Sequence, residues 1–381
     1  MTAKKVAILV GEESGDLLGA DLVRGLKARL GPDLELTGVG GAHLQTEGLH
    51  TIIDPSELAL MGISAIIKRL PQLVWRIRQV AAQIIAAKPD ILIIIDSPEF
   101  THRVARKVRA ALPNVPVINY VCPSVWAWRP ERAKAMTAYI DEVLCVLPFE
   151  PNELKRLGGP TGTYVGHRLN TDADVLRVAH IRAQRTGPSG ELMLLPGSRS
   201  GEIERLLPEM IETAKLNLAN GTAKTVTIPT LERHKSLIAA AVSNAGLPCR
   251  VLTGSQEKWA AFASADAALA ASGTVSLELA LCGVPHAAVY RLDYLAKKFI
   301  WPRVVTWSGN LPNLIANDVV VPESYEEYFR RGAHSRLLAG LMSTNGPNRI
   351  AQLAGFEQIR RILKTDRPTA ELAADRVMRY L

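Results

Sequence analysis

Several short loops combine small residues with charges at points where an apolar run gives way to a helical pattern. The first loop, Gly11–Gly19, reads GEESGDLLG and follows the apolar run Val6–Val10. Its glycines would let backbone N–H groups approach a ligand closely, and the start of the following helix favours anions. Its acidic residues make it a poor cradle for pyrophosphate and suit sugar hydroxyl groups better. A tight strand-to-helix turn in which Asp16 is a cap accounts for the same residues.

A second loop, Pro196–Ile203, joins small residues to a cation. It reads PGSRSGEI and follows the apolar run Leu192–Leu195. Arg199 could fork onto phosphate oxygens while backbone N–H groups complete the cradle, an arrangement that suits a nucleoside diphosphate. The alternative is that Arg199 lies on the surface and pairs with Glu202 or Glu204.

A third loop, Ala271–Glu278, reads ASGTVSLE and again opens a helical pattern with small residues. Glu278 comes one turn into that helix, where its carboxylate could accept hydrogen bonds from two ribose hydroxyl groups. An exposed acid on the helix surface is the alternative interpretation.

A single carboxylate, Asp96, ends the most apolar run of the chain, Ile91–Ile95, which reads ILIII. A charge at the end of a buried strand is costly unless it has a partner or a task. The carboxyl end of such a strand is also where ligands bind in α/β proteins. We therefore predict that Asp96 is a general base, with Glu99 as the other candidate. Asp96 could instead cap the following helix.

The elements that must position these loops alternate between short β-branched runs and helical patterns, which indicates parallel sheets covered on both faces. The predicted strands of the first half are Val6–Val10, Glu35–Val39, Ile91–Asp96, Pro116–Val121, Glu142–Leu147 and Thr163–Val165. Those of the second half are Leu192–Leu195, Thr225–Ile228, Arg250–Leu252, Ala267–Ala270 and His286–Tyr290. The predicted helices include Leu17–Leu30, Phe100–Ala111, Leu207–Leu218 and Ser276–Leu281.

The chain has 381 residues, more than one core usually holds, so we expect two domains. Residues 1–169 form the first predicted Rossmann-like domain, and residues 191–350 form the second. The polar, glycine-containing stretch 170–190 is predicted to link them. Residues 351–381 read as C-terminal helices that could pack back onto the first domain. Two such domains that face each other would leave a ligand-binding cleft at the carboxyl ends of their strands.

Composition and charge limit the classes of ligand and partner that the chain is expected to bind. A formal net charge of +8 favours anionic ligands or surfaces, but the basic residues are spread along the chain without a nucleic-acid-binding motif. No run approaches the ~20 apolar residues that span a bilayer, and the N-terminus does not read as a secretory signal. The four cysteines form no CxxC pair, so neither a zinc site nor a disulfide framework is expected.

Residues 58–85, LALMGISAIIKRLPQLVWRIRQVAAQII, interleave basic side chains with large apolar ones. The pattern is typical of a pair of interfacial helices on anionic lipid, and it could also line a pocket for acyl chains. An amphipathic helix that packs on the sheet, with solvated basic residues, is the alternative. The residues predicted to contact lipid or acyl chains are Ile66, Ile67, Lys68, Arg69, Leu70, Leu73, Val74, Trp75 and Arg76.

The order and spacing of these motifs resemble those of the lipid-A-disaccharide synthase family from about Val6 to about Pro322, with a looser fit to the end. The blocks that carry the resemblance are GEESGDLLGADL (11–22), VGGAHLQTEGL (39–49), ELALMGISAIIKRLP (57–71), IDSPEF (95–100), YVCPSVWAWRPERAK (120–134), LPFEP (147–151), YVGH (164–167), LLPGSRSGEI (194–203), SGTVSLELAL (272–281) and LPNLIA (311–316). So many blocks in one order are highly specific.

The resemblance implies a GT-B fold and transfer of a diacylglucosamine unit from UDP-2,3-diacylglucosamine to the 6-hydroxyl group of 2,3-diacylglucosamine 1-phosphate. The anomeric centre inverts, and the products are lipid A disaccharide 1-phosphate and UDP, on the route to lipopolysaccharide. The family implies no cofactor and no catalytic metal, since the UDP-sugar is a substrate. It also implies a peripheral enzyme on the cytoplasmic face of the inner membrane of a Gram-negative cell, with no nucleic-acid partner. A homodimer is left open.

Residue by residue, the resemblance makes Asp96 the general base and Arg199 the ligand of the leaving UDP phosphates. The full set of residues predicted to bind substrate or nucleotide is Ser14, Gly15, Gly197, Ser198, Arg199, Glu202, Gly273, Thr274, Glu278 and Asn313. The carried-over placement puts Ser14 and Gly15 on the acceptor side, facing Asp96.

The chain departs from the family pattern at several positions. Glu99 and Thr101 stand where Asp and Asn are usual, Cys122 replaces Ser, Arg168 replaces Pro and Glu13 replaces a small residue. The stretch 305–310 also differs. Two alternatives are kept: another UDP-sugar enzyme of the same fold, such as an epimerase or a soluble glycosyltransferase, and a non-catalytic nucleotide-binding module at the membrane.

Overall fold

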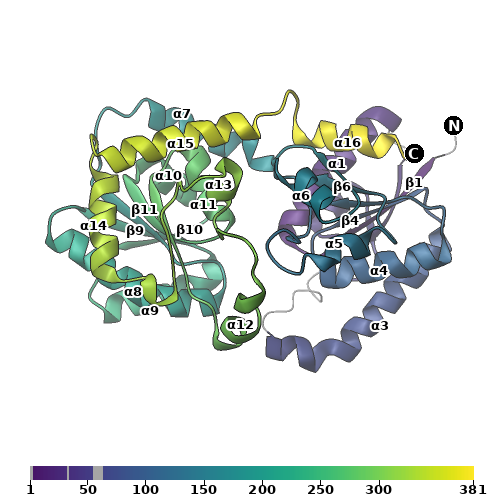
Figure 1. Ribbon diagram of the computed structural model, residues 1–381, viewed down its shortest axis with the longest axis horizontal. Helices are drawn as coiled ribbons and strands as arrows, with labels where there is room; N and C mark the ends of the chain where they lie inside the picture. Colours follow the sequence, from purple (N-terminus) through teal and green to yellow (C-terminus); the bar gives the residue numbers. More distant parts are fainter. Residues whose placement is uncertain (1–2, 32–33, 55–62) are drawn as a thin grey trace. The chain divides into compact units, whose positions relative to one another are not determined.

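The computed structural model describes residues 3–31, 34–54 and 63–381, and within 63–70 it describes the backbone alone. The chain divides into two compact units (Figure 1). Unit 1 holds residues 1–168 and 365–381, and unit 2 holds residues 169–364. Each unit is built around one parallel sheet, which confirms the predicted α/β class.

Unit 1 contains a seven-stranded sheet in the order β3-β2-β1-β4-β5-β6-β7. Its strands are β1 Lys4–Val10, β2 Leu34–Val39, β3 His50–Thr51, β4 Ile91–Ile95, β5 Val117–Tyr120, β6 Glu142–Cys145 and β7 Thr161–Tyr164. Its helices are α1 Glu13–Leu30, α2 Ala42–Thr46, α3 Ile63–Ala87, α4 Pro98–Ala111, α5 Glu131–Met136, α6 Glu150–Arg156 and α16 Thr369–Met378, and a 3-10 turn at Arg168–Asn170 leads into unit 2.

The central strand β4 is buried at every residue, as its apolar sequence predicts. Ile91, Ile93 and Ile95 enter a core shared with α1 and α16. Leu92 and Ile94 point into the opposite core, which α3 and α4 cover. Alternate residues of one strand thus pack against helices on both faces of the sheet. This packing holds the carboxyl end of the strand, which Asp96 follows, in place.

Unit 2 contains a six-stranded sheet in the order β10-β9-β8-β11-β12-β13. Its strands are β8 Glu191–Leu195, β9 Thr225–Thr230, β10 Arg250–Thr253, β11 Ala267–Ala271, β12 His286–Tyr290 and β13 Glu323–Tyr325. Its helices are α7 Ala173–Ala183, α8 Ser200–Ala219, α9 Glu232–Asn244, α10 Ser255–Ser264, α11 Thr274–Cys282, α12 Tyr294–Phe299, α13 Leu311–Ala316, α14 Arg331–Met342 and α15 Pro347–Leu363, with 3-10 turns η3 Trp301–Arg303 and η4 Glu326–Tyr328.

The stretch predicted as a linker, 170–190, is an integral part of unit 2. Its helix α7 packs against α10 and α11 and buries Val175 and Val178. Arg182 donates hydrogen bonds to the backbone carbonyl groups of four residues, Phe262, Ala263, Ala265 and Gly283. The linker interpretation is therefore corrected, because polar residues that looked solvated satisfy the ends of neighbouring elements.

The C-terminal stretch 351–381 is divided between the units. Helix α15 packs against α11, α13 and α14 of unit 2. The chain then returns to unit 1, where α16 packs against α1 (Figure 1). Arg376 of α16 also forms an ion pair of 2.5 Å with the buried Glu142 of β6. The return differs from the prediction in one respect, since α16 alone of the two helices joins the first domain.

Residues 58–85 were predicted to hold a pair of helices, but the described part, from Ile63, forms the single helix α3. Pro71 lies inside this helix and does not divide it. The second half of α3 buries Ile77, Val80 and Ile84 in the core of unit 1. Residues 58–62 lie outside the described part of the chain.

Candidate active site

Asp96 lies directly after β4, in the short turn that leads into helix α4. Both Asp96 and Ser97 have left-handed backbone angles, with φ of 54° and 44°. Non-glycine residues seldom adopt such angles, and each costs about 1 kcal/mol or more unless its surroundings hold it there. The turn precedes α4, and the Thr101 hydroxyl group of that helix donates to the Asp96 carbonyl group at 2.7 Å.

The first loop of the sequence analysis lies against this turn. A Cβ atom built on Gly15 would stand 2.6 Å from the Asp96 Oδ2 atom, and one on Gly11 would overlap the side chain of Ser97. Gly15 is buried in the first turn of α1, whereas Ser14 is exposed. The loop and Asp96, distant in the sequence, thus meet because β1 and β4 are neighbours in register.

The electrostatic surroundings of Asp96 suit a general base. Burial, and secondly the negative charge of Glu12, raises the pKa of Asp96 to about 6. A carboxylate with that pKa is mostly ionised at neutral pH and is a stronger proton acceptor than an ordinary aspartate.

Asp16, in the same loop, has a structural task. Its carboxylate accepts hydrogen bonds from the backbone N–H groups of Gly41 at 2.6 Å and His43 at 2.9 Å. These groups open helix α2, so Asp16 caps a helix other than its own. The predicted cap is therefore corrected in its target: Asp16 caps α2, whereas the N-cap position of its own helix α1 is Glu12, without a side-chain cap hydrogen bond.

Glu99, the other candidate base, is engaged with arginine side chains. Arg132 donates to its Oε1 atom at 2.5 Å and Arg103 to its Oε2 atom at 3.2 Å. Burial alone would raise the pKa of Glu99, but the hydrogen bonds and charges of Arg132 and Arg103 lower it overall. A carboxylate with a lowered pKa is a weaker proton acceptor, so the structure favours Asp96 as the base.

In unit 2 the loop Pro196–Ile203 connects β8 to α8, and Gly197 has a left-handed φ of 112°. A Cβ atom on Gly197 would lie 2.6 Å from the Oε2 atom of Glu202. Arg199, whose side chain is 67% exposed, pairs with Glu202 at 3.1 Å. The surface pairing considered for Arg199 is therefore present, and the exposed guanidinium keeps donors available for an anion.

Two residues of α9 that the sequence analysis did not single out brace this loop. The carbonyl oxygen of Ser198 lies 2.9 Å from the Nε2 atom of His234 and accepts a hydrogen bond from Arg233 at 3.3 Å. Arg233 is exposed and adds a second cation beside Arg199. The run Leu231–His234 has no glycine-rich signature, so only the packing of α8 against α9 reveals it.

The third loop lies between β11 and α11, and Thr274 is the first residue of that helix. The hydroxyl group of Ser272 donates to the Gly309 carbonyl group at 2.9 Å, and Gly273 precedes the helix in an extended conformation. Glu278 pairs with Lys258 of α10 at 2.6 Å and is largely buried. The alternative of a freely exposed helix acid is thus not what the structure shows for Glu278.

Asn313 was predicted to contact the nucleotide, but the structure gives it a bracing role. Its side chain is fully buried in α13. Its amide group donates to the Val321 carbonyl group at 2.9 Å, and its Oδ1 atom accepts from the N–H groups of Val320 and Val321 at 3.0 and 2.7 Å. These bonds occupy the side chain, so the prediction of a direct ligand contact is corrected.

The structure describes the side chains of only some of the residues predicted to contact lipid. Val74 is 37% exposed and Trp75 is 56% exposed, whereas Leu73 is half-buried against the core of unit 1. The Arg76 guanidinium lies 4.6 Å from the centre of the Trp75 ring. Ile66, Ile67, Lys68, Arg69 and Leu70 lie outside the residues whose side chains are described. No described helix is both long enough and apolar enough to span a bilayer.

Unit 2 carries a second exposed apolar segment, which sequence reasoning missed. Exposed aromatic and aliphatic side chains gather in α12, η3 and the stretch that follows, namely Tyr294, Leu295, Phe299, Trp301, Val305 and Trp307. Lys298 and Arg303 lie among them. The signal in the sequence is the density of aromatic and basic residues in 294–307, a stretch without a glycine-rich loop pattern.

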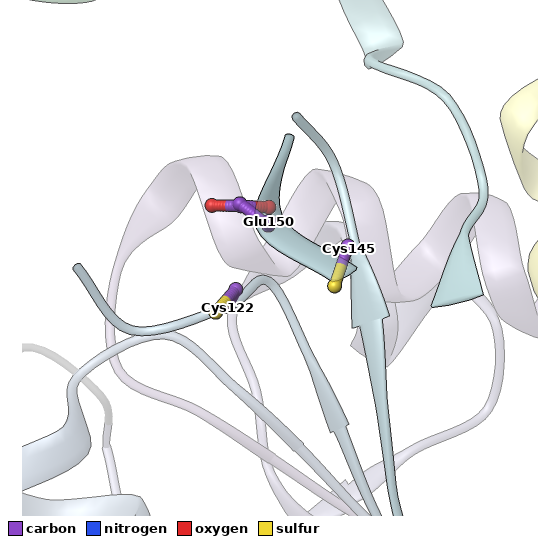
Figure 2. A group of neighbouring side chains, drawn as sticks. All are labelled: Cys122, Cys145 and Glu150. Atoms are coloured by element: carbon purple, nitrogen blue, oxygen red, sulfur yellow. The ribbon is translucent and has the colours of Figure 1, made fainter. Parts of the chain in front are cut away.

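One group of possible metal ligands occurs among the described residues: Cys122, Cys145 and Glu150, whose ligand atoms lie within 4.8 Å of one another (Figure 2). The donor set does not fit a metal. Glu150 already accepts hydrogen bonds from the N–H groups of Val146 and Leu147 and from Trp126. A hydrogen bond to Cys145, together with burial, raises the pKa of Cys122 far above that of a free thiol, and a thiol is a poor ligand.

Known proteins with similar sequences match this chain over almost its whole length. The chain is 42% identical over 381 residues to the lipid-A-disaccharide synthase of Rhodopseudomonas palustris strain BisB18, with 99% of this chain and 96% of that protein covered. It is 44% identical over 379 residues to the protein of the same name from Nitrobacter winogradskyi strain Nb-255, with 99% and 95% covered.

Solved structures of similar architecture include the glycotransferase of kitacinnamycin, with a TM-score of 0.63, 16% identity and 100% of both chains covered. The UDP-GlcNAc 2-epimerase of Neisseria meningitidis follows with a TM-score of 0.57, 11% identity and 99% of both chains covered. At such identities the likeness shows the fold alone, and it does not separate a transferase from an epimerase.

The sequence relatives do distinguish a transferase from an epimerase. Residues 6–364 match the protein family described as lipid-A-disaccharide synthetase, and the relatives named above share that description over almost the whole chain. The chain therefore belongs to the lipid-A-disaccharide synthase family of glycosyltransferases and has the GT-B fold.

Proposed function

We propose that the chain transfers 2,3-diacylglucosamine from UDP-2,3-diacylglucosamine to the 6-hydroxyl group of 2,3-diacylglucosamine 1-phosphate. Membership of the family gives the reaction class, and the surroundings of Asp96 carry the proposal to this chain. The Asp96 carboxylate accepts the proton of the attacking hydroxyl group. The hydroxyl oxygen forms a bond to the anomeric carbon as the bond from that carbon to UDP breaks, so the centre inverts.

The departing UDP carries the negative charge that develops in this step. The exposed guanidinium of Arg199, with the N–H groups of the Gly197–Ser198 turn, is suited to bind its phosphates. Arg233 supports the same loop through Ser198. Fixed cations aimed at a leaving diphosphate lower the barrier to its departure. Glu278, held by Lys258, would accept the ribose hydroxyl groups in this arrangement.

The experiment that tests the reaction supplies both lipid substrates and follows the disaccharide and UDP by mass. Asp96→Asn should lower kcat by roughly 10²–10⁴-fold, the usual contribution of a general base. The variant should fold, because the raised pKa of Asp96 means that its charge costs stability as the pH rises from 3.8 to about 6. Glu13→Gln, an exposed acid of the same loop, is the control.

Two other results would point elsewhere. Equal activity on unacylated UDP-sugar would indicate a soluble sugar enzyme of the same fold. Binding of UDP without turnover of the lipid substrates would indicate a non-catalytic module. Retained activity of Asp96→Asn would remove that residue from the role of base and leave the reaction standing.

Peripheral binding to an anionic membrane surface, such as the cytoplasmic face of an inner membrane, is the second part of the proposal. Two exposed segments support it: Val74–Trp75 on α3 and the aromatic segment 294–307 of unit 2. Aromatic side chains among basic ones are typical of interfacial contacts. Co-sedimentation with anionic liposomes should weaken in Trp75→Glu and in Trp307→Glu. Ile350→Glu, at an equally exposed apolar residue outside both segments, is the matched control.

A further inference from the structure

A cavity of about 190 Å³ opens beside helix α4 in unit 1, and no step described so far uses it. Its walls include three arginines, Arg103, Arg106 and Arg132, together with His102, Glu99 and Tyr139. Relative to Glu99, the residues His102, Arg103 and Arg106 lie three, four and seven positions later in α4, so all four share one face of the helix.

The charge inside this cavity is unbalanced. Glu99 is the single carboxylate among its lining residues, and it is held by Arg103 and Arg132. Arg106 forms no ion pair among the described residues. Its guanidinium lies 4.6 Å from the centre of the Tyr139 ring and donates to the Tyr139 hydroxyl group at 3.2 Å.

His102 does not add to the positive charge at neutral pH. Burial, and secondly the charges of Arg106 and Arg132, lowers the pKa of His102 to about 4. Its Nδ1 atom lies 3.0 Å from the Tyr139 hydroxyl oxygen. Three arginines against one carboxylate leave two positive charges, which matches the charge of about −1.5 to −2 that a phosphate monoester carries near pH 7.

The position of the cavity connects it to the reaction. Pro98 and Glu99, which line it, are the first two residues of α4 and follow Asp96 by two and three positions. The helix that carries Arg103 and Arg106 therefore begins directly after the candidate base. In the proposed acceptor one hexose ring separates the 6-hydroxyl group from the 1-phosphate, so a compact site could hold both.

We propose that the arginine-lined cavity beside α4 binds a phosphate monoester, namely the 1-phosphate of the acceptor sugar. The inference rests on the proposed function for the identity of that ligand. Arg103 and Arg106 donate to the phosphate oxygens, and Arg132 is shared between Glu99 and the phosphate. The phosphate then positions the acceptor, while Asp96 alone takes the proton.

The test compares two acceptors, 2,3-diacylglucosamine 1-phosphate and the same lipid without its phosphate. Arg106→Gln and Arg103→Gln should lower kcat/KM for the phosphorylated acceptor by roughly 10–100-fold, as expected for hydrogen bonds to a charged group. Neither should change kcat/KM for the other acceptor. The matched control is Lys107→Gln, which removes a charge from the same helix outside the cavity. Equal losses with both acceptors would overturn the proposal.

A second variant should change phosphate affinity in the opposite direction, towards tighter binding. Glu99→Gln removes the carboxylate that competes with phosphate for Arg103 and Arg132, and should tighten binding of glucosamine 1-phosphate about fivefold. A merely structural arginine cluster would loosen in that variant and bind no better. Phosphorus NMR of wild type, Glu99→Gln and Arg106→Gln with glucosamine 1-phosphate, and separately with inorganic phosphate, measures these affinities.

The binding measurement also separates failure of this site from failure of the proposed function. If the wild type transfers to neither lipid acceptor, the proposed reaction fails. Weaker glucosamine 1-phosphate binding by Arg106→Gln than by wild type would still support the phosphate site, and equal binding would refute it. Inorganic phosphate that binds as tightly as the sugar phosphate, with an unchanged acceptor KM in Arg106→Gln, would identify a free-phosphate site and contradict the proposal.

Discussion

At the scale of single residues, the difference between the two acids after β4 lies in their neighbours. Burial, and secondly the like charge of Glu12, raises the pKa of Asp96 to about 6. Glu99, three positions later, is bound by arginines, and its pKa is lowered. The same functional group is thus a stronger proton acceptor in one place and part of a charged cavity in the other, which is why the proposed mechanism assigns the base to Asp96.

The pH dependence of transfer should follow the pKa of Asp96. The proposed mechanism needs the ionised carboxylate in the free enzyme, so kcat/KM should fall as the pH drops below about 6. Glu12→Gln removes the like charge that raises this pKa, and the acidic limb of the profile should move to lower pH by about half a unit. The rate profiles of wild type, Glu12→Gln and Glu13→Gln check this. An unmoved limb in Glu12→Gln would mean that another group limits the rate.

At the scale of elements, the close approach of α1 to the turn after β4 depends on a missing side chain. A Cβ atom on Gly15 would meet the Asp96 Oδ2 atom at 2.6 Å and the Val10 side chain at 3.0 Å. Gly15→Ala should displace the carboxylate and lower kcat by roughly 10²-fold, while the fold survives.

Gly332→Ala is the matched control for this change. Gly332 lies in α14, and the nearest heavy atom to its added Cβ atom would be 3.9 Å away. We expect unchanged kcat and a thermal midpoint that is equal or higher, since alanine favours a helix over glycine by up to about 1 kcal/mol. Normal activity in Gly15→Ala would show that the base does not depend on this contact.

The bracing role of Asn313 leads to a prediction for the segment that follows α13. Asn313→Ala leaves the buried N–H group of Val321 without its acceptor, while the half-buried Val320 N–H group keeps the Asp318 carbonyl oxygen, so the free energy of unfolding should fall by about 1–3 kcal/mol. Urea denaturation measures the change, with Asn348→Ala, an exposed asparagine of α15, as the control. Unchanged stability combined with lost UDP affinity would instead support a direct ligand contact.

At the scale of the whole molecule, the path of the chain ties its last helix to its first. Helix α16 places Ala373, Ala374 and Val377 in the same core as Leu22 and Leu26 of α1. Arg29 of α1 pairs with Asp375 of α16 at 2.5 Å. Unit 1 therefore needs both ends of the chain, although unit 2 is continuous in sequence.

Removal of residues 365–381 should destabilise unit 1 and leave unit 2 folded. The deletion exposes an apolar face of α1 and leaves the buried Glu142 without Arg376, and loss of one partner of a buried pair alone costs about 3–5 kcal/mol. Hydrogen exchange resolved by peptide should speed up in α1 and β1 and stay unchanged in α8 and β8. Equal acceleration in both units would indicate that they unfold together.

The sequence by itself determined the layered α/β architecture. Short, β-branched apolar runs such as Ile91–Ile95 are typical of strands buried on both faces, and β4 is one. The same logic placed Asp96 and the loops Gly11–Gly19 and Pro196–Ile203 at the carboxyl ends of strands. It passed over the short edge strands β3 and β13, whose two and three residues leave no periodic signal.

Only the tertiary structure decided which side chains meet across the sheets and helices. In the folded chain Gly15 lies against Asp96, and Glu99 pairs with arginines of α4 and α5. The side-chain amide of Asn313 forms hydrogen bonds with the segment that follows α13. The tertiary structure also assigned α7 to unit 2 and α16 to unit 1. Periodicity reports whether a residue is buried, because burial follows from the local pattern of the chain. The partner of a buried or charged group depends on residues far away in sequence, and the folded chain alone brings them together.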